Sequence, residues 1–381
     1  MKRKYLWLIG GIPVLLVVVA AYLLFPVMGA KNANDKVYVA AEDAGRIDVI
    51  SPKSQSVIAS IDLANNDNVD GAMYMAHNVQ VAPDEKSVWV TANAMANHTA
   101  SLKTRIVNKL FPTAYANEGH DEVSAAVDQV VVIDPLTDKI TRRIDVGSDL
   151  HLAHVVLTPD SKFALVSSQN KGEVYKIDTE TFRVVATAKA KSNAQPHGLR
   201  ISPDGKFAYV ALMGDKSIGK LNLSTLTFEY IPLTGTPVQT GITADGKYAL
   251  ASVFTGKSLA IVDTANQSVR YASLPSDAKG PLQLYPSSDV RYAYVADQGN
   301  DFGQPAGNSL YKVDVQQAKT VQTIRVGTAP HGVVVSPDDK YTYVTNMESD
   351  DVSVVDNNAG KEVARISVGK KPNGISHRTK P

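Results

Sequence analysis

The stretch PHGLRISPDGKFAYV, at residues 196–210, returns in nearly the same form as PHGVVVSPDDKYTYV at residues 330–344. Each copy contains a short apolar run, a turn built on Ser-Pro-Asp, and a second run that is rich in aromatic and β-branched residues. Runs of this kind, separated by Pro, Asp and Gly, are typical of β-strands joined by tight turns. The stretch therefore predicts a hairpin that the chain repeats.

Turns of the same type recur along most of the chain. They begin at Ala82, Thr158, Ser202, Thr243, Pro286 and Ser336. From Asp160 to Asp289 the aspartates of four successive turns are 44, 41 and 44 positions apart, although the two turns that begin at Thr243 and Pro286 lack the Pro-Asp pair. This spacing is typical of a four-stranded propeller blade, and the Val, Ile, Tyr and Phe of the runs favour strands over a helical repeat.

The two ends of the chain complement each other. The first unit lacks the opening strand of the other units and starts at residues 37–39. Residues 372–377 match that opening strand, and the repeat stops there. We expect this last strand to complete the first blade, which closes the ring without a long open edge. The six other blades are expected to open near His77, His154, His197, Val238, Pro281 and His331.

The sequence thus predicts an all-β protein, a seven-bladed β-propeller over residues 31–381. An N-terminal transmembrane or signal helix is expected at residues 1–30. Blade 2 carries an insertion at about residues 93–128, some thirty residues longer than the same connection in the other blades.

The amino-acid sequence of the repeat resembles that of the YVTN β-propeller family. The two stretches quoted above and the tetrapeptide YVTN at residues 343–346 carry the resemblance, which covers the chain from Val37 to the C-terminus. It implies the seven-bladed fold. It leaves function open, because related propellers include surface-layer proteins, DNA-binding periplasmic proteins, lactonase-like enzymes and the d1-haem domains of nitrite reductases.

Composition excludes several classes of site. The 381 residues include no cysteine, which excludes disulfides, thiol catalysis, thiolate metal sites and covalent c-type haem attachment. Lys and Arg number 39 against 38 Asp and Glu, which gives a formal net charge of +1. The net charge therefore does not indicate a nucleic-acid partner, and any charged surface must be local.

The N-terminus has the pattern of an export segment. Lys2, Arg3 and Lys4 precede a run from residue 5 to residue 30 that carries no charge. Basic residues before an apolar run keep the N-terminus in the cytoplasm and send the remainder across the membrane. The run is longer than a typical signal-peptide core, which favours an uncleaved anchor over a cleaved signal peptide. Both alternatives predict an extracytoplasmic propeller, at the membrane or secreted.

Histidines gather where the innermost strands are expected to begin. His77, His154, His197 and His331 are predicted at equivalent positions of four blades, around one mouth of the central channel, and His151 lies beside them. Histidine can bind metal or carry a proton, and it can also simply cap a strand or bond a loop. Ligand bonds are only about 2 Å long, so one metal ion shared by all four is not expected. A flat cofactor, or a ligand held by adjacent pairs of histidines, fits this spacing better.

The blade 2 insertion is predicted on the same face, where it resembles a lid. It contains His98 and His120, and Met73, Met75 and Met95 flank it together with His77. Thioether and imidazole groups both suit copper, so these residues are a candidate metal site. Methionine that fills a gap under a loop is the alternative.

Three functions fit this pattern. The first is a monomeric binding or scaffold protein that takes a protein or small-molecule ligand on the histidine-bearing face and is held at the membrane by its N-terminal helix. The second is a carrier of a haem-like cofactor or copper. The third is a lactonase-like enzyme, although the Gly-x-Ser-x-Gly motif of serine hydrolases is absent.

Overall fold

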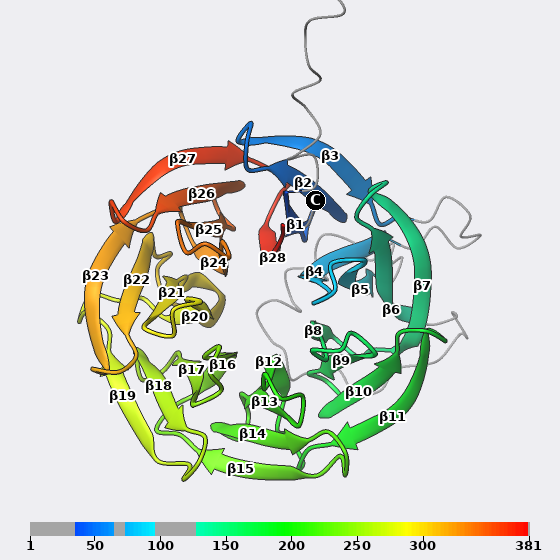
Figure 1. Cartoon of the computed structure of the whole chain (residues 1–381), viewed down its shortest axis with the longest axis horizontal. Helices are drawn as coiled ribbons and strands as arrows, with labels where there is room; N and C mark the ends of the chain where they lie inside the picture. Colours follow the sequence, from blue (N-terminus) through cyan, green and yellow to red (C-terminus); the bar gives the residue numbers. More distant parts are fainter. Residues whose placement is uncertain (1–34, 65–72, 96–126, 380–381) are drawn as a thin grey trace, which may run out of the picture.

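A computed structural model describes residues 35–64, 73–95 and 127–379, and its strands form seven sheets arranged in a ring (Figure 1). The predicted N-terminal helix and most of the blade 2 insertion lie outside the described residues. Within the described ranges, no helix is long and apolar enough to cross a membrane.

Each sheet has four antiparallel strands, and the seven sheets are numbered here as blades 1 to 7. Blade 1 contains β28 (Pro372–Arg378), β1 (Lys36–Ala41), β2 (Arg46–Ser51) and β3 (Ser56–Asp62). Blade 2 contains β4 (Met73–Val81), β5 (Val88–Met95), β6 (Val127–Asp134) and β7 (Lys139–Ser148). Blade 3 contains β8 (Leu152–Leu157), β9 (Phe163–Ser168), β10 (Glu173–Asp178) and β11 (Arg183–Lys189). Blade 4 contains β12 (Pro196–Ile201), β13 (Phe207–Leu212), β14 (Ser217–Asn222) and β15 (Phe228–Pro232).

The remaining blades follow the same order from the axis outward. Blade 5 contains β16 (Pro237–Ile242), β17 (Tyr248–Val253), β18 (Ser258–Asp263) and β19 (Val269–Ser273). Blade 6 contains β20 (Pro281–Pro286), β21 (Tyr292–Asp297), β22 (Ser309–Asp314) and β23 (Lys319–Arg325), with the 3₁₀ helix η1 (Asn300–Phe302) between β21 and β22. Blade 7 contains β24 (Pro330–Val335), β25 (Tyr341–Asn346), β26 (Asp351–Asp356) and β27 (Lys361–Ser367).

Pairing of the two chain ends closes the ring, as predicted. β28 lies beside β1, where Val37 pairs with His377 and Val39 pairs with Ile375 (Figure 1). The Ser376 hydroxyl also accepts the backbone N–H of Val81 at 3.0 Å, so the last strand is attached to blade 2 as well as to blade 1. The predicted seven-bladed, all-β fold is confirmed.

Strand position in a blade decides which residues are buried. All six residues of the innermost strand β24 are buried, because neighbouring blades cover both of its faces. The outermost strand β27 alternates exposed and covered residues, as expected where only one face meets a neighbour. Apolar clusters therefore lie between adjacent blades; Trp89 of blade 2, for example, stacks on Phe182 of blade 3 with ring centroids 6.2 Å apart.

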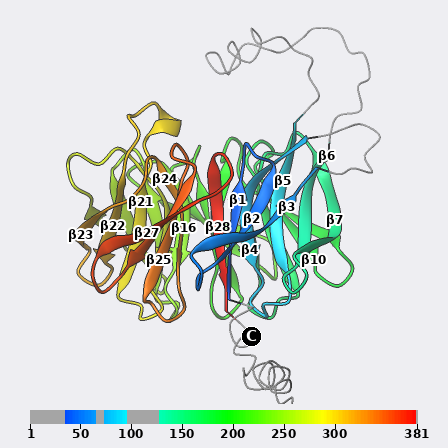
Figure 2. The same cartoon turned by 90° about the horizontal axis from the view of Figure 1, so that it is seen from above.

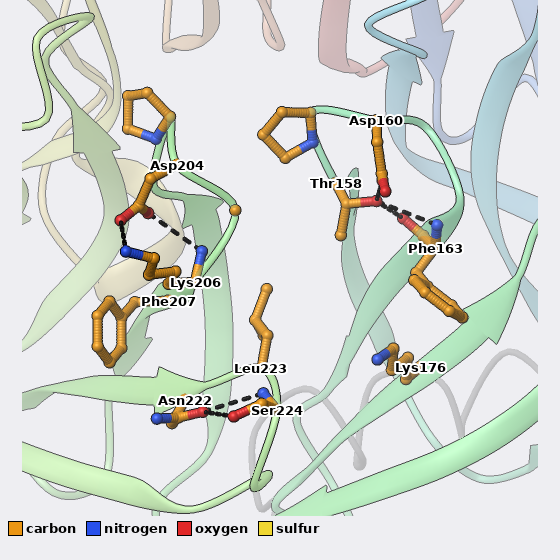
Figure 3. A pocket seen from close by; sticks show the side chains of 13 residues that line it. Thr158, Asp160, Phe163, Lys176, Asp204, Lys206, Phe207, Asn222, Leu223 and Ser224 are labelled. Atoms are coloured by element: carbon orange, nitrogen blue, oxygen red, sulfur yellow. Dashed lines mark hydrogen bonds and ion pairs between the residues drawn. The ribbon is translucent and has the colours of Figure 1, made fainter.

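The repeated turns are stabilised by a hydroxyl and an aspartate rather than by proline. In blades 3 to 7 the first Ser or Thr donates a hydrogen bond of 2.5–2.7 Å to the aspartate two residues later. Thr158 and Asp160 show the arrangement in Figure 3. The Thr243 and Ser287 turns keep this bond, which explains why they form the same structure without a Pro-Asp pair.

The disc has two different faces (Figure 2). On one, named here the link face, the links 149–151, 190–195, 233–236, 274–280, 326–329 and 368–371 lead into the innermost strands. On the other, the turn face, the hydroxyl–aspartate turns join the first and second strands of each blade. The end of β5 and the start of β6 lie on the link face, together with η1.

Candidate functional site at the propeller axis

The innermost strands carry a bulge near the link face. In β12 the register with β13 shifts between Pro196 and Leu199, which leaves His197 and Gly198 in the bulge. The same shift occurs at the start of β8, β16, β20 and β24. A bulge redirects side chains from the regular alternation of a strand, so two consecutive residues of these five strands leave that alternation near the link face.

Three of the four predicted ring histidines occupy the first bulge position. These are His77, His197 and His331. His154 occupies the second position, because its backbone N–H bonds the Ser167 hydroxyl just as the N–H of Asn78 bonds the Thr91 hydroxyl. The expectation of four equivalent positions was therefore wrong by one residue for His154.

Four histidines from blades 2, 3 and 4 meet at the axis. The ring centroid of His77 lies 5.5 Å from that of His151, 6.3 Å from that of His154 and 5.9 Å from that of His197. The His154 and His197 centroids are 5.1 Å apart. All except His151 are buried, so the structure brings together four of the five predicted binding residues as one histidine cluster.

Glu42 supplies a negative charge to this histidine cluster. Its carboxylate accepts a hydrogen bond from His77 Nδ1 at 3.0 Å and another from Asn373 Nδ2 at 2.8 Å. Burial alone would raise the pKa of Glu42, but the charge of His77 and these hydrogen bonds outweigh it and lower the pKa to about 2. The fifth predicted residue, His331, is buried in blade 7 and its charge acts on Glu42 in the same direction.

His197 and His154 are neutral at ordinary pH. Burial, above all, lowers the pKa of His197 to about 3, and His77 acts in the same direction. Burial, above all, also holds the pKa of His154 well below 6.5, and the charge of Arg200 acts in the same direction. His197 Nδ1 donates to the Val238 carbonyl at 2.9 Å, which leaves a lone pair on Nε2. Both ring nitrogens of His154 are buried without a hydrogen-bond partner among the described residues.

Glutamines occupy the next two blades of the ring. Gln239 and Gln283 occupy the same bulge position as His154, in blades 5 and 6. Both amide atoms of Gln239 and the amide nitrogen of Gln283 are buried without a partner in the described part of the chain. Gly198 gives the Gln239 amide its space, since a Cβ atom at residue 198 would lie 1.5 Å from Gln239 Oε1. The bulge position that carries an imidazole in blade 3 therefore carries an amide in blades 5 and 6.

Four residues of this site were missed in the sequence. Gln239, Gln283 and Asn373 stand at blade openings, so a residue-by-residue comparison of these openings could have found them. Glu42 follows β1, outside the repeated motif, and no signal in the sequence distinguishes it from other surface carboxylates.

The predicted copper site is described only in part. Met73 and Met95 are cross-strand partners at the link-face ends of β4 and β5, Met75 is partly buried, and Met73 is 58% exposed. His98 and His120 lie outside the described residues. In residues 35–64, 73–95 and 127–379, no three His, Asp or Glu side chains are placed to hold a metal ion. The methionine-histidine site stays a prediction.

A cavity of about 520 Å³ between blades 3 and 4 has a different character (Figure 3). It opens on the turn face, and its polar side chains bond one another: Thr158 to Asp160, and Ser224 to Asn222. Its polar groups are therefore occupied by the turns themselves, whereas the buried imidazole of His154 at the axis has no such partner.

The buried histidines predict an acid-sensitive fold. Below about pH 6.5 the unfolded chain takes up protons that folded His154 and His197 exclude, so stability is full above that pH and falls as pH drops towards their lowered pKa values. The lowered pKa of Glu42 acts the same way, but below pH 4.5. We expect His154→Leu to reduce the slope of unfolding free energy against pH by up to about 1.4 kcal/mol per unit between about pH 5 and 6.5.

Urea denaturation at several pH values measures this slope. Gln283→Leu is the matched control, since it removes an axial polar group that does not titrate, and it should keep the wild-type slope. Equal slopes for the wild type and His154→Leu would show that His154 is not held neutral in the folded state.

Comparison with known proteins agrees with this fold. A family model described as "Lactonase, 7-bladed beta-propeller" matches residues 154–365, which is more than half of the chain. No curated protein matches the chain. The finer assignment to YVTN propellers rests on the repeat wording alone.

Three solved structures illustrate the likeness in fold. Hydrazine synthase of Kuenenia stuttgartiensis is 18% identical, with 79% of this chain and 89% of that chain covered and a TM-score of 0.62. Virginiamycin B lyase from Staphylococcus aureus, in selenomethionine form, is 12% identical over 82% and 90%, with a TM-score of 0.61. A protein of unknown function from Desulfotomaculum acetoxidans DSM 771 is 15% identical over 90% and 98%, with a TM-score of 0.67. At these identities the structures support the fold alone, while the family model shows that the chain belongs to the lactonase family of seven-bladed β-propellers.

Proposed function

We propose that this propeller is an extracytoplasmic, membrane-associated binding protein that takes a small polar ligand at the histidine cluster. One observation carries the proposal: the imidazole of His154 is fully buried, and both of its nitrogens lack a partner in the described residues. An unpaired buried polar group costs about 1–3 kcal/mol. A ligand that hydrogen-bonds this imidazole would remove that cost.

The charge of the site favours a ligand with hydrogen-bond donors. His197 offers a lone pair on Nε2, and Glu42 carries a negative charge that its low pKa maintains. Lone pairs and a carboxylate accept hydrogen bonds, so ammonium and hydroxyl groups complement this side of the mouth. The amide of Gln239, beside Gly198 of blade 4, adds a donor and an acceptor next to the histidines, which suits a ligand with mixed polar groups.

His154→Leu separates binding from folding. The substitution removes an unpaired buried polar group, so we expect it to raise the melting temperature of the free protein and to abolish ligand-induced stabilisation. Thermal unfolding of the full chain with spermidine, glucose or glycine betaine measures both effects. The first two probes carry N–H or O–H donors, and betaine has a cationic nitrogen without them.

Gln283→Leu again provides the control, because it makes a similar change in blade 6, away from the histidines. It should retain stabilisation by a donor-bearing probe. If no donor-bearing probe stabilises the wild type, or if His154→Leu responds as the wild type does, the histidine cluster is not the binding site.

A second candidate is hydrolysis of a lactone, which the His77–Glu42 pair and the family both favour. A carboxylate can only accept, so Nδ1 of His77 carries the proton and the carboxylate holds the ring in place. A histidine oriented by a carboxylate is the arrangement of a general base, which could activate water through Nε2. The matching family is described by its lactonase activity.

His77→Asn tests this candidate on γ-butyrolactone, δ-valerolactone and glucono-δ-lactone. Loss of a general base lowers kcat by about 100-fold or more, and Glu42→Gln should lower it less, because the ring stays but loses its orientation. His377→Asn is the control: His377 Nε2 pairs with Asp35 at 2.6 Å on the turn face, outside the axial site. Absence of turnover above buffer, or equal loss in both histidine variants, would rule out the His77–Glu42 hydrolase.

The extracytoplasmic location rests on residues 1–30, where a basic N-terminus precedes a long uncharged run. An alkaline phosphatase fusion after residue 379 should be active only outside the bacterial cytoplasm. Lys2→Glu, Arg3→Glu and Lys4→Glu together should lower its activity, because the basic residues set the orientation. An inactive wild-type fusion would place the propeller in the cytoplasm.

A further inference from the structure

A second feature of the axis lies nearer the turn face, on the same strand as His197. Arg200 of β12 pairs in register with Tyr209 and stands three residues after the first bulge position, His197. The residues with the corresponding pairing in the other six blades are Gln80, Val156, Gly241, Tyr285, Val334 and Ser376. Arg200 is therefore the one charged residue among these seven, all of which lie in the described part of the chain.

The guanidinium of Arg200 has few partners. Nη1 donates to the Leu199 carbonyl at 2.9 Å, and no Asp or Glu side chain in the described ranges forms an ion pair with it. Burial lowers the pKa of Arg200, and of the neighbouring groups only Tyr285 acts against that shift. A guanidinium has five N–H donors, so most of its donors remain available to a ligand.

Arg200 lines a cavity of about 360 Å³ that opens on the turn face. Tyr285 lines it too. Blade 5, between them, has Gly241 at the corresponding position and so places no side chain there. Apolar side chains form much of the remaining wall: Ile242, Ala244, Pro286, Val335 and Pro337. The cavity thus combines one cation with an apolar surface, at the lower end of the size range of small-molecule sites.

The cavity's carboxylate belongs to the fold. Asp339 accepts the backbone N–H of Ser288 at 2.9 Å and that of Asp289 at 3.1 Å, and the Ser288 hydroxyl also donates to it. These bonds join the turns of blades 6 and 7. Asp339 is thereby committed to the turns, and the charge of Arg200 is left for a ligand.

We propose that this cavity is a second binding site, for a small organic carboxylate with a compact apolar body. The planar fork of Arg200 matches a carboxylate through two parallel hydrogen bonds. The apolar part of the ligand would lie against Ile242, Val335 and Pro337. Three residues along a strand span about 10 Å, so the site is separate from the histidine cluster and does not depend on the function proposed for it.

Benzoate is the probe, and benzamide is its uncharged analogue of the same shape. Calorimetric titration of the full chain should show benzoate binding at least about tenfold more tightly than benzamide, a difference of about 1.4 kcal/mol. Arg200→Met should weaken benzoate by at least about tenfold. Arg200→Lys should give an intermediate affinity, since lysine keeps the charge and loses the fork. Circular dichroism confirms that each variant folds.

Arg142→Met is the matched control. Arg142 also donates to the carbonyl of the preceding residue, at 2.7 Å, but lies exposed on β7, so its replacement should leave benzoate affinity unchanged. His154→Leu should leave it unchanged as well, which separates this site from the histidine cluster. No benzoate binding at about 10 mM, equal binding of benzamide, or wild-type affinity in Arg200→Met would overturn the proposal. Tighter binding of inorganic phosphate than of benzoate would overturn the carboxylate assignment.

Discussion

Closure of the ring by β1 and β28 is the constraint on which the rest of the structure depends. Residues more than 300 positions apart must pair before blade 1 is complete and before blades 1 and 7 have neighbours on both sides. Once they do, every innermost strand is covered by its neighbours, and the apolar clusters between blades form a continuous circle. The axial side chains are held in place by this circle, since each comes from a strand that neighbouring blades confine. A rigid frame of this kind can keep polar groups buried in fixed positions. Their burial costs free energy, which a mobile loop would avoid by exposing the same groups to water.

The bulge at the start of the innermost strands decides what the axis presents. It takes two consecutive residues of a strand out of the regular alternation near the link face. Glycine at the second position of blade 4 makes room for the glutamine of blade 5, so the composition of one blade controls the conformation of the next. His154, Gln239 and Gln283 share one bulge position, so their blades differ there in the side chain and not in the backbone.

Much of the fold could be predicted from the sequence, because it is encoded redundantly. The Ser or Thr and the Asp of the turns in blades 3 to 7 recur at blade spacing, and the unpaired strand at residues 372–377 indicated closure. The site was less accessible. His77, His197 and His331 could be placed by comparing repeats, since each stands seven residues before the aspartate of its turn. His154 was placed one residue out, because it stands only six residues before Asp160 and that spacing was not used. Glu42 and Arg200 each occur once, and a residue that is not repeated has no signal in a comparison of repeats.

The position of β1 also has a consequence for orientation. Lys36 pairs with Arg378, so the described chain begins on the turn face, beside its own last strand. Only residues 31–34 separate Asp35 from the uncharged N-terminal run, and four extended residues span at most about 14 Å. A propeller tethered through that run would hold its turn face close to the lipid headgroups. The link face with the histidines would then point away from the membrane, towards ligands in solution. The Arg200 cavity would open towards the layer of water between the disc and the membrane.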